Sequence, residues 1–429
     1  MTDSIQKSRC HGRLISEMAK ELYSFQKDAI EQLLNGKHFI ISGVGSGKTA
    51  MALVWASKKC KETYKDKVLV VTTASKSRTG DFEEEDKEWN SDSDKKEMTV
   101  LSWHKLAKWV DENRGKWDDY IIIFDEVQRG SAGVSSGMGR AFLKLTNKNH
   151  DWAAFTGTPG DTWLKFYPYF TACNLVSCKT AFLDEYANVR TYKGYPEIIG
   201  WRNEDKLKSM WAKISYAPDT RRVMSELPEQ IHKVFTFSKP KTYSKTLKTR
   251  YNENGEFLDT AGALCAELRR QCFTKDKQEW VKDFVDGLES GCVFFYNFIK
   301  TGDMLEEIIK KVLPKDAKVW RIDGRHHDIP TAETIGPKDM VLCQWQSGSE
   351  ALNLQFLHYW VAVELCYSYS TANQARGRIR RLGQKHPQWY GYLLTEGTIE
   401  QDILKCLKQK GEFSEANWCI SNNLIIEGE

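Results

Sequence analysis

The segment HFIISGVGSGKTAMAL, residues 38–53, carries the plainest structural signal in the chain. It opens with an apolar run typical of a buried strand, continues through glycines 43, 45 and 47, and ends in residues that favour a helix. A glycine-rich turn between a strand and a helix points backbone N–H groups at an anion, and the helix N-terminus adds its positive end. The segment therefore predicts a phosphate-binding loop.

The side chains of this loop suit a nucleotide with its metal ion. Lys48 would place its charge beside the β- and γ-phosphates, and the Thr49 hydroxyl would hold Mg²⁺. The backbone that would surround the phosphates belongs to Gly43, Val44, Gly45, Ser46 and Gly47, together with Lys48 and Thr49. Ser42 stands where the common form of this loop has glycine. A glycine turn beside a surface lysine is the alternative, and the flanking strand and helix argue against it.

A second segment, YIIIFDE at residues 120–126, places two carboxylates at the end of an apolar strand. Ligands of α/β sheets bind at the carboxyl ends of the strands, so these two groups should lie near the phosphate loop. We expect Asp125 to bind Mg²⁺ through water and Glu126 to orient and deprotonate an attacking water molecule. An Asp-Glu pair alone is common in loops. The presence of the phosphate loop with Lys48 in the same chain favours the interpretation as a catalytic and metal-binding pair.

Short apolar runs separated by helix-length segments recur in both halves of the chain. Such runs are typical of parallel strands that are covered on both faces. Strands are predicted at 38–42, 68–73, 99–102, 120–124 and 153–156, and again at 292–296, 318–322, 340–343, 359–364 and 389–395. Because 429 residues exceed one ordinary core, we predict two doubly wound α/β lobes, 1–222 and 223–429. Few strand signals occur between 164 and 278, which we interpret as a helical extension of the first lobe, a link and the opening helices of the second.

Composition narrows the class of protein only coarsely. Hydrophobic residues make up 41% and charged residues 28% of the chain, no apolar run reaches the roughly 18 residues of a membrane span, and residues 1–20 lack a signal-peptide core. We therefore expect a cytoplasmic protein without membrane contact. The eleven cysteines show no Cys-x-x-Cys spacing, which favours reduced thiols over structural zinc. The net charge of +4 neither demands nor excludes nucleic acid.

Two further segments resemble motifs of a known family. Residues 374–384, QARGRIRRLGQ, are close to motif VI of superfamily-two helicases, and residues 155–159, FTGTP, are similar to motif III of their Swi/Snf-type group. The chain resembles Swi/Snf-type DNA-dependent ATPases in a compact viral or phage-like form, from about residue 22 to residue 410. The resemblance implies two tandem RecA-like lobes with an ATP cleft between them, and ATP with Mg²⁺ as cofactors.

Within the segment that resembles motif VI, Arg378 and Arg381 are three residues apart. On one helix they would share a face and reach one target. A guanidinium group suits the charge spread over a transferring phosphoryl group, so these residues are candidates for arginine fingers. The alternative is a basic helix that contacts phosphate backbones, which could coexist with catalysis.

The remaining motifs of the family imply roles for residues elsewhere. Gln26 would read the adenine edge of ATP. Six residues in segments similar to motifs Ia, Ib, IV and V would contact nucleic acid: Thr73, Ser75, Ser102, Asn297, Ser347 and Gly348. Four residues would couple the ATP site to movement: Gln128 (where the family has His), Thr156, Thr158 and Gln374.

The resemblance implies an ATP-dependent DNA translocase or helicase. Its partner would be DNA, with double-stranded DNA favoured, weak sequence preference and strong salt sensitivity, while RNA stays possible. A viral form would act in the host cytoplasm. Two other classes stay open: a phosphate-loop ATPase of another lineage, such as a packaging motor, and an inactive binding scaffold. The packaging motor leaves residues 374–384 unexplained, and the scaffold leaves the full set of charged site residues unexplained.

Overall fold

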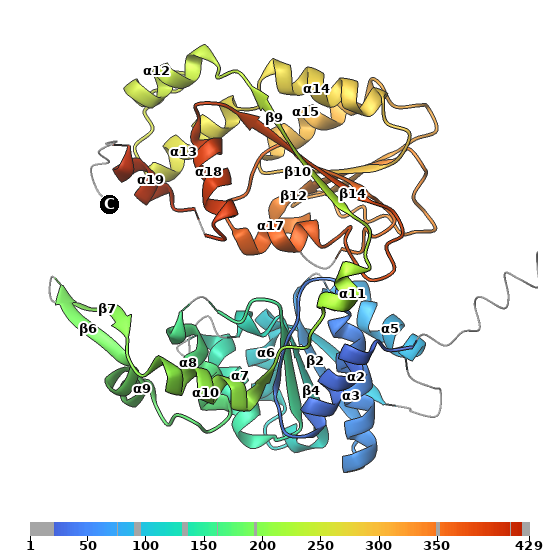
Figure 1. The fold of residues 1–429 in the computed structure, drawn as a ribbon, viewed down its shortest axis with the longest axis vertical. Helices are drawn as coiled ribbons and strands as arrows, with labels where there is room; N and C mark the ends of the chain where they lie inside the picture. Colours follow the sequence, from blue (N-terminus) through green and yellow to red (C-terminus); the bar gives the residue numbers. More distant parts are fainter. Residues whose placement is uncertain are drawn as a thin grey trace, which may run out of the picture. The chain divides into compact units, whose positions relative to one another are not determined.

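The computed structural model describes residues 21–74, 76–89, 96–130, 136–160, 162–192, 195–348, 352–411 and 413–422. The chain separates into two compact units, Met1–Thr220 and Arg221–Glu429. Each unit contains its own parallel sheet with helices on both faces (Figure 1). Among the described residues, no helix is both long and apolar enough to cross a membrane.

In the described part of the first unit, six parallel strands form a sheet in the order β3-β2-β4-β5-β1-β8. The strands are β1 (Phe39–Ile41), β2 (Lys67–Thr72), β3 (Glu97–Ser102), β4 (Tyr120–Asp125), β5 (Trp152–Thr156) and β8 (Ser215–Tyr216). The helices are α2 (Ser24–Leu34), α3 (Lys48–Thr63), α4 (Lys76–Thr79), α5 (Asp81–Trp89), α6 (Trp103–Glu112), α7 (Gly137–Lys148), α8 (Trp163–Ala172), α9 (Lys179–Tyr186) and α10 (Glu204–Ile214), with short turns η1 (Trp117–Asp119) and η2 (Val127–Arg129).

Alternation along the central strands explains why both faces of this sheet are buried. On β2, Val68 and Val70 pack on the face covered by α2 and α3, whereas Leu69 and Val71 pack on the face covered by α6 and α7 (Figure 1). All four side chains are fully buried. A continuous apolar strand therefore serves two hydrophobic cores, as expected for a parallel sheet inside α/β layers.

The second unit repeats this plan in the order β11-β12-β10-β13-β14-β9, again with all strands parallel. The strands are β9 (Gln230–Phe237), β10 (Cys292–Tyr296), β11 (Val319–Ile322), β12 (Met340–Gln344), β13 (Tyr359–Ala362) and β14 (Gln388–Thr395). The helices are α11 (Arg221–Ser225), α12 (Lys241–Thr249), α13 (Ala261–Gln271), α14 (Lys275–Asp286), α15 (Ile299–Lys310), α16 (Trp345–Gly348), α17 (Tyr369–Arg376), α18 (Ile399–Lys408) and α19 (Glu415–Ser421). The predicted fold class of two doubly wound parallel sheets in series is confirmed.

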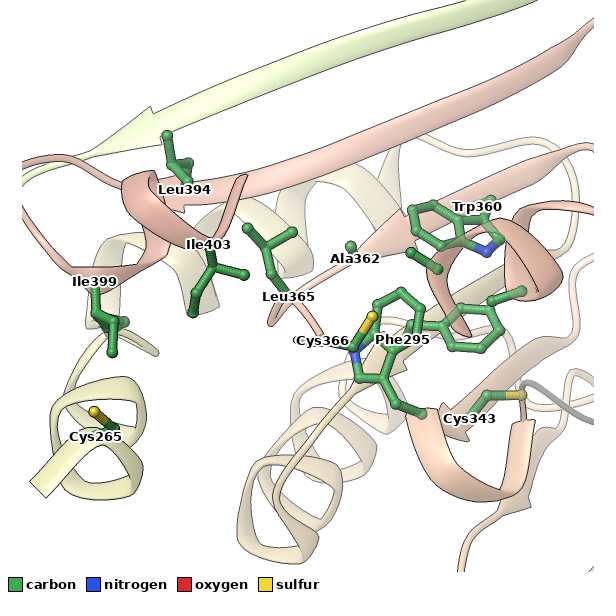
Figure 2. Close-up of a cluster of buried hydrophobic side chains, with 14 of the residues drawn as sticks. Cys265, Phe295, Cys343, Trp360, Ala362, Leu365, Cys366, Leu394, Ile399 and Ile403 are labelled. Atoms are coloured by element: carbon green, nitrogen blue, oxygen red, sulfur yellow. The ribbon is translucent and has the colours of Figure 1, made fainter. Parts of the chain in front are cut away.

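The core of the second unit is also divided by its sheet. Phe295 and Trp360 pack with Cys265 and Ile403 on the face that carries α13 and α18 (Figure 2). Helices α14 and α15 cover the opposite face, where the buried Phe294 lies. The two central strands, β10 and β13, are thus enclosed in the same way as β2 and β4 of the first unit.

Among the described residues, four strands lie in the stretch 164–278, where the sequence showed few strand signals, and one of them is the two-residue β8 at the edge of the first sheet. A hairpin of β6 (Ala187–Tyr192) and β7 (Tyr195–Trp201) extends away from the sheet of the first unit (Figure 1). Strand β9 pairs with β14 over its whole length at the edge of the second sheet. No residue of β9 is fully buried, and Val234 is among the exposed ones. An edge strand of this kind lacks the apolar run by which the other strands were predicted.

Candidate active site

The predicted phosphate loop follows β1 and leads directly into α3. Gly45 and Gly47 have φ angles of +79° and +76°, a region that favours glycine because it has no Cβ. Gly47 is the N-cap of α3 and supplies no side-chain cap to the helix. The first backbone N–H groups of this 16-residue helix therefore keep the capacity to bind an anion.

The serine that replaces glycine at the start of the loop braces it from within. The hydroxyl of Ser42 donates to the hydroxyl of Ser46 at 2.6 Å, and Ser46 donates in turn to the carbonyl of Gly43 at 2.8 Å. Both serine side chains are buried. The departure from the common motif thus adds one internal hydrogen bond, from Ser42 to Ser46. Lys48 completes the loop by donating to the carbonyls of Ser42 and Gly43 at 2.9 and 3.0 Å.

Gln26, the predicted adenine-reading residue, contacts the same loop. Its Nε2 donates to the carbonyl of Ser46 at 3.0 Å, and its Oε1 accepts from the backbone N–H of Tyr23 at 2.9 Å. The side chain is buried, so both ends of the amide are engaged within the protein. In this structure Gln26 positions the phosphate loop, and its contact with adenine stays a prediction.

The close approach of Gln26 makes Gly47 a sharp test of the loop. A Cβ atom at Gly47 would lie 2.4 Å from Nε2 of Gln26, and the residue would also keep a positive φ. We expect Gly47→Ala to weaken ATP binding by about tenfold or more, because either the loop or the Gln26 amide that supports it must shift to relieve the clash. Titration with a fluorescent ATP analogue measures this.

Gly36→Ala is the matched control, since Gly36 has a φ of +94° but nothing within 4 Å of an added Cβ. We expect it to lower the free energy of unfolding by about 1–2 kcal/mol without changing ATP affinity. Equal nucleotide affinity of the two variants would contradict the assignment of Gln26 as a support of the loop.

Asp125 lies at the end of β4 and is held by residues from the end of β2. Its Oδ2 accepts from the hydroxyl of Thr72 at 2.7 Å and from Nζ of Lys76 at 2.9 Å. Burial opposes ionisation, but the charge of Lys76 and these hydrogen bonds hold the pKa of Asp125 below its usual value. The indole of Trp103 fixes the backbone by donating to the Asp125 carbonyl at 2.9 Å.

Sequence reasoning missed Lys76 and Thr72 although a signal for them existed. Val71 of β2 pairs with Phe124 of β4, so the next residues, Thr72 and Asp125, end their strands at the same edge. Since adjacent parallel strands present their following segments together, a partner of the carboxylate is expected in the segment after β2.

A chain of hydrogen bonds connects Glu126 to the end of β5. Nε2 of Gln128 donates to the Glu126 carboxylate at 2.5 Å, and the hydroxyl of Thr156 donates to Oε1 of Gln128 at 2.6 Å. The same hydroxyl accepts from the backbone N–H of Thr158 at 3.0 Å. Glu126 has a φ of +50°, which is uncommon outside glycine. The proposed water-activating carboxylate is therefore held by a specific relay.

The relay ends beside the phosphate loop. A Cβ atom at Gly157 would lie 3.3 Å from the carbonyl of Ser42 and 3.9 Å from Nζ of Lys48. The segment that resembles motif III thus packs closely against the loop and its lysine. The coupling role of Gln128, Thr156 and Thr158 stays a prediction. Consecutive hydrogen bonds link these residues to Glu126 and provide a route for such coupling.

The predicted nucleic-acid contacts of the first unit are less open than expected. The side chains of Thr73 and Ser102 are buried, and the Thr73 hydroxyl accepts from the backbone N–H of Lys76 at 3.4 Å. Ser75 lies outside the described residues. Contact of these groups with nucleic acid stays a prediction.

In the second unit, Arg378 and Arg381 do not share a helix. Helix α17 ends at Arg376, Arg378 lies in the turn that follows and Arg381 lies in irregular chain beyond it, so the expectation of a common helix face was wrong. They nevertheless reach one target, because both guanidinium groups donate to the carbonyl of Leu352, at 3.4 and 3.0 Å. Arg378 is buried, whereas Arg381 is partly exposed.

A buried carboxylate that sequence reasoning missed organises the segment similar to motif IV. Glu364, after β13, accepts from the backbone N–H groups of Asn297 and Phe298 at 2.6 and 3.1 Å and from the hydroxyl of Thr301 at 2.7 Å. Burial raises the pKa of Glu364. The Glu364 carboxylate therefore fixes the backbone of Asn297, a predicted nucleic-acid contact. Of the other predicted residues, Ser347 and Gly348 lie on α16 and Gln374 on α17.

Comparison with known proteins agrees with these motifs. Residues 19–161 match the family described as "Type III restriction enzyme, res subunit". The human protein named "DNA annealing helicase and endonuclease ZRANB3" is 21% identical over 93% of this chain and 40% of its own length. The "Uncharacterized ATP-dependent helicase YqhH" of Bacillus subtilis is 36% identical over 73 residues, which are 17% of this chain and 13% of that protein.

Among solved structures, the SWI2/SNF2 ATPase core of Sulfolobus solfataricus in complex with dsDNA aligns with a TM-score of 0.42 and 16% identity, over 95% of this chain and 94% of that chain. The family match and the named relatives confirm the resemblance to helicases. The chain spans about two fifths of the length of the human relative it matches.

Proposed function

We propose that this chain is an ATP-dependent motor that moves along or remodels DNA, as a translocase or a helicase. The observation that carries the proposal is the set of groups in the first unit: the phosphate loop with Lys48, Asp125 bound by Thr72, and Glu126 linked through Gln128 to the end of β5 beside the loop. A nucleotide-binding scaffold without hydrolysis would have no use for a carboxylate held in strained backbone beside a hydrogen-bonded relay. The helicase names of the relatives support the same activity.

The residues present fit a magnesium ion. Asp125 already holds a cationic group, the ammonium of Lys76, and the Thr49 hydroxyl at the start of α3 is a second oxygen donor of the kind Mg²⁺ prefers. Bound there, Mg²⁺ would neutralise charge on the phosphates. The loop N–H groups and Lys48 would hold the phosphates, and Glu126 would accept the proton of the attacking water.

We propose that the two units correspond to the two lobes of the motor, which were predicted at 1–222 and 223–429, with Arg378 and Arg381 of the second completing the chemistry begun in the first. These arginines stabilise the negative charge of a transferring phosphoryl group only when nucleotide is bound. ATP binding and hydrolysis would therefore shift the equilibrium between arrangements of the lobes. If each lobe also grips the backbone of DNA, repeated cycles move the strand with little sequence preference. We also propose that the protein acts in the cytoplasm and that RNA can serve as a substrate in place of DNA.

The test is whether nucleic acid stimulates ATP hydrolysis. Turnover is measured with double-stranded DNA, single-stranded DNA, RNA and no nucleic acid, with Lys48→Ala as the blank. We expect stimulation to be greatest with double-stranded DNA and to fall steeply with salt. Triplex displacement beside strand displacement then separates tracking along a duplex from unwinding. Turnover that is indifferent to every nucleic acid would overturn the proposal.

A further inference from the structure

The ammonium group of Lys76 forms an ion pair with Asp125, the carboxylate that is proposed to bind Mg²⁺. Its Nζ lies 2.9 Å from Oδ2 of Asp125, whose side chain is only 5% exposed, while Lys76 itself is 19% exposed. The ammonium also lies over the ring of the buried Phe82, 5.6 Å from its centroid. Lys76 is therefore held from two sides, by a charge and by an aromatic face.

The strand order shows that Lys76 approaches Asp125 from the side opposite to the phosphate loop. Strand β4 lies between β2, which leads to Lys76, and β5, beyond which β1 leads to the loop and Lys48. Lys48 and Lys76 therefore follow strands that lie on opposite sides of β4, the strand that carries Asp125. Thr72, also from the end of β2, donates to the same oxygen as Lys76 and strengthens the hold from that side.

Electrostatics gives this arrangement a consequence for metal binding. A buried carboxylate is costly to keep ionised without a cation, and Lys76 supplies one while the site holds no metal. The same positive charge repels any divalent cation that approaches Asp125 within a few ångströms, and partial burial leaves this repulsion poorly screened. Nucleotide phosphates bring negative charge and further oxygen ligands, which shift the balance toward the metal.

We propose that Lys76 is a built-in counter-cation that competes with Mg²⁺ for Asp125, so that metal binds this site only together with nucleotide. The inference rests on the proposed function, because it assumes that Asp125 belongs to a site for Mg²⁺ and ATP. It assigns to the loop after β2 a direct influence on the metal site. The hydroxyl of Thr73, a predicted nucleic-acid contact, accepts a hydrogen bond from the backbone N–H of Lys76. A change in the conformation of this segment would therefore move Lys76.

The test measures metal binding without nucleotide, with Mn²⁺ as the probe because it prefers the same oxygen ligands. Free Mn²⁺ is followed by electron paramagnetic resonance in wild type, Lys76→Met and Lys76→Arg. We expect Lys76→Met to bind Mn²⁺ at least about tenfold more tightly than wild type, and Lys76→Arg to match wild type because it keeps the charge. Asp125→Asn in the Lys76→Met background should remove the gain.

A melting experiment covers the case in which Lys76→Met folds poorly. Mn²⁺ should then raise the melting temperature of Lys76→Met and of the milder Lys76→Gln more than that of wild type, because the metal replaces the lost cation. Equal Mn²⁺ affinity and equal thermal shifts in wild type and both neutral variants would overturn the inference. The assay contains no ATP, so tighter Mn²⁺ binding in a protein whose wild type shows no nucleic-acid-stimulated hydrolysis would count against the proposed function alone.

Discussion

Replacing Arg381 by alanine should lower the rate of DNA-stimulated ATP hydrolysis by about three to five orders of magnitude, with ATP and DNA binding retained. Arg381 is a partly exposed residue whose guanidinium donates to the carbonyl of Leu352 at 3.0 Å, so we expect its removal to cost the fold less than removal of a fully buried arginine. Arg378 donates to the same carbonyl but is only 6% exposed, so its removal would damage the fold as well as the chemistry. Arg381 is therefore the cleaner probe of an arginine finger. Single-turnover hydrolysis under saturating ATP measures the effect.

Arg380 provides the matched control for this prediction. With the Gln230 amide oriented so that its oxygen faces Arg380, that oxygen accepts from Nε of the arginine at 3.0 Å, which ties Arg380 to strand β9. We expect Arg380→Ala to keep hydrolysis within about tenfold of wild type and Lys48→Ala to abolish it, as loss of the phosphate-loop lysine should. Hydrolysis by Arg381→Ala within tenfold of wild type would show that Arg381 takes no part in the chemistry.

The elements that could be predicted from sequence are those whose residues signal their own environment. Strand β4 is a continuous apolar run because both of its faces are buried, and the glycines of the phosphate loop mark positive φ angles at Gly45 and Gly47. Strand β9 gives no such signal, because at the edge of its sheet none of its residues is fully buried and only Phe235 and Phe237 pack against the core of that face. The hairpin of β6 and β7 was missed for a related reason, since Val189 and Ile199 are exposed and serve no core.

The parts of the candidate site that could not be predicted depend on partners distant in sequence. For Lys76, the strand pairing indicates only that the segment after β2 begins near Asp125, and which residue of that segment binds the carboxylate depends on its folded conformation. Glu364 was read as the end of a strand, whereas its carboxylate fixes the backbone of Asn297, 67 residues away. The motif around Arg378 and Arg381 was recognised, but its helical form was not, because the spacing of two arginines does not show that α17 ends before them.

A second large effect concerns the stability of the second unit and arises from a buried ion pair. Nζ of Lys277 lies 2.7 and 3.0 Å from the two carboxylate oxygens of Glu400, with the side chains 0% and 2% exposed. One of these oxygens also accepts from the backbone N–H of Thr395 at 2.8 Å. The pair thus joins helix α14 to the end of β14 and to the start of α18. Thr398, which opens α18, contributes a weaker contact, from the Glu400 N–H to its hydroxyl at 3.3 Å.

Lys277→Met should lower the free energy of unfolding of the second unit by about 3–5 kcal/mol, because it leaves a buried carboxylate without its cation. The double variant Lys277→Met/Glu400→Leu should recover part of this loss, since it removes the stranded charge as well. Lys282→Met on the same helix is the control: its pair with Glu279 is exposed and should change stability by less than about 1 kcal/mol. Urea unfolding of the full chain, with hydrogen exchange of peptides from α14 and α18, assigns the change to this unit. If Lys277→Met were no less stable than Lys282→Met, the buried pair would have to be solvated in solution, and the packing of α14 against α18 would differ from that described above.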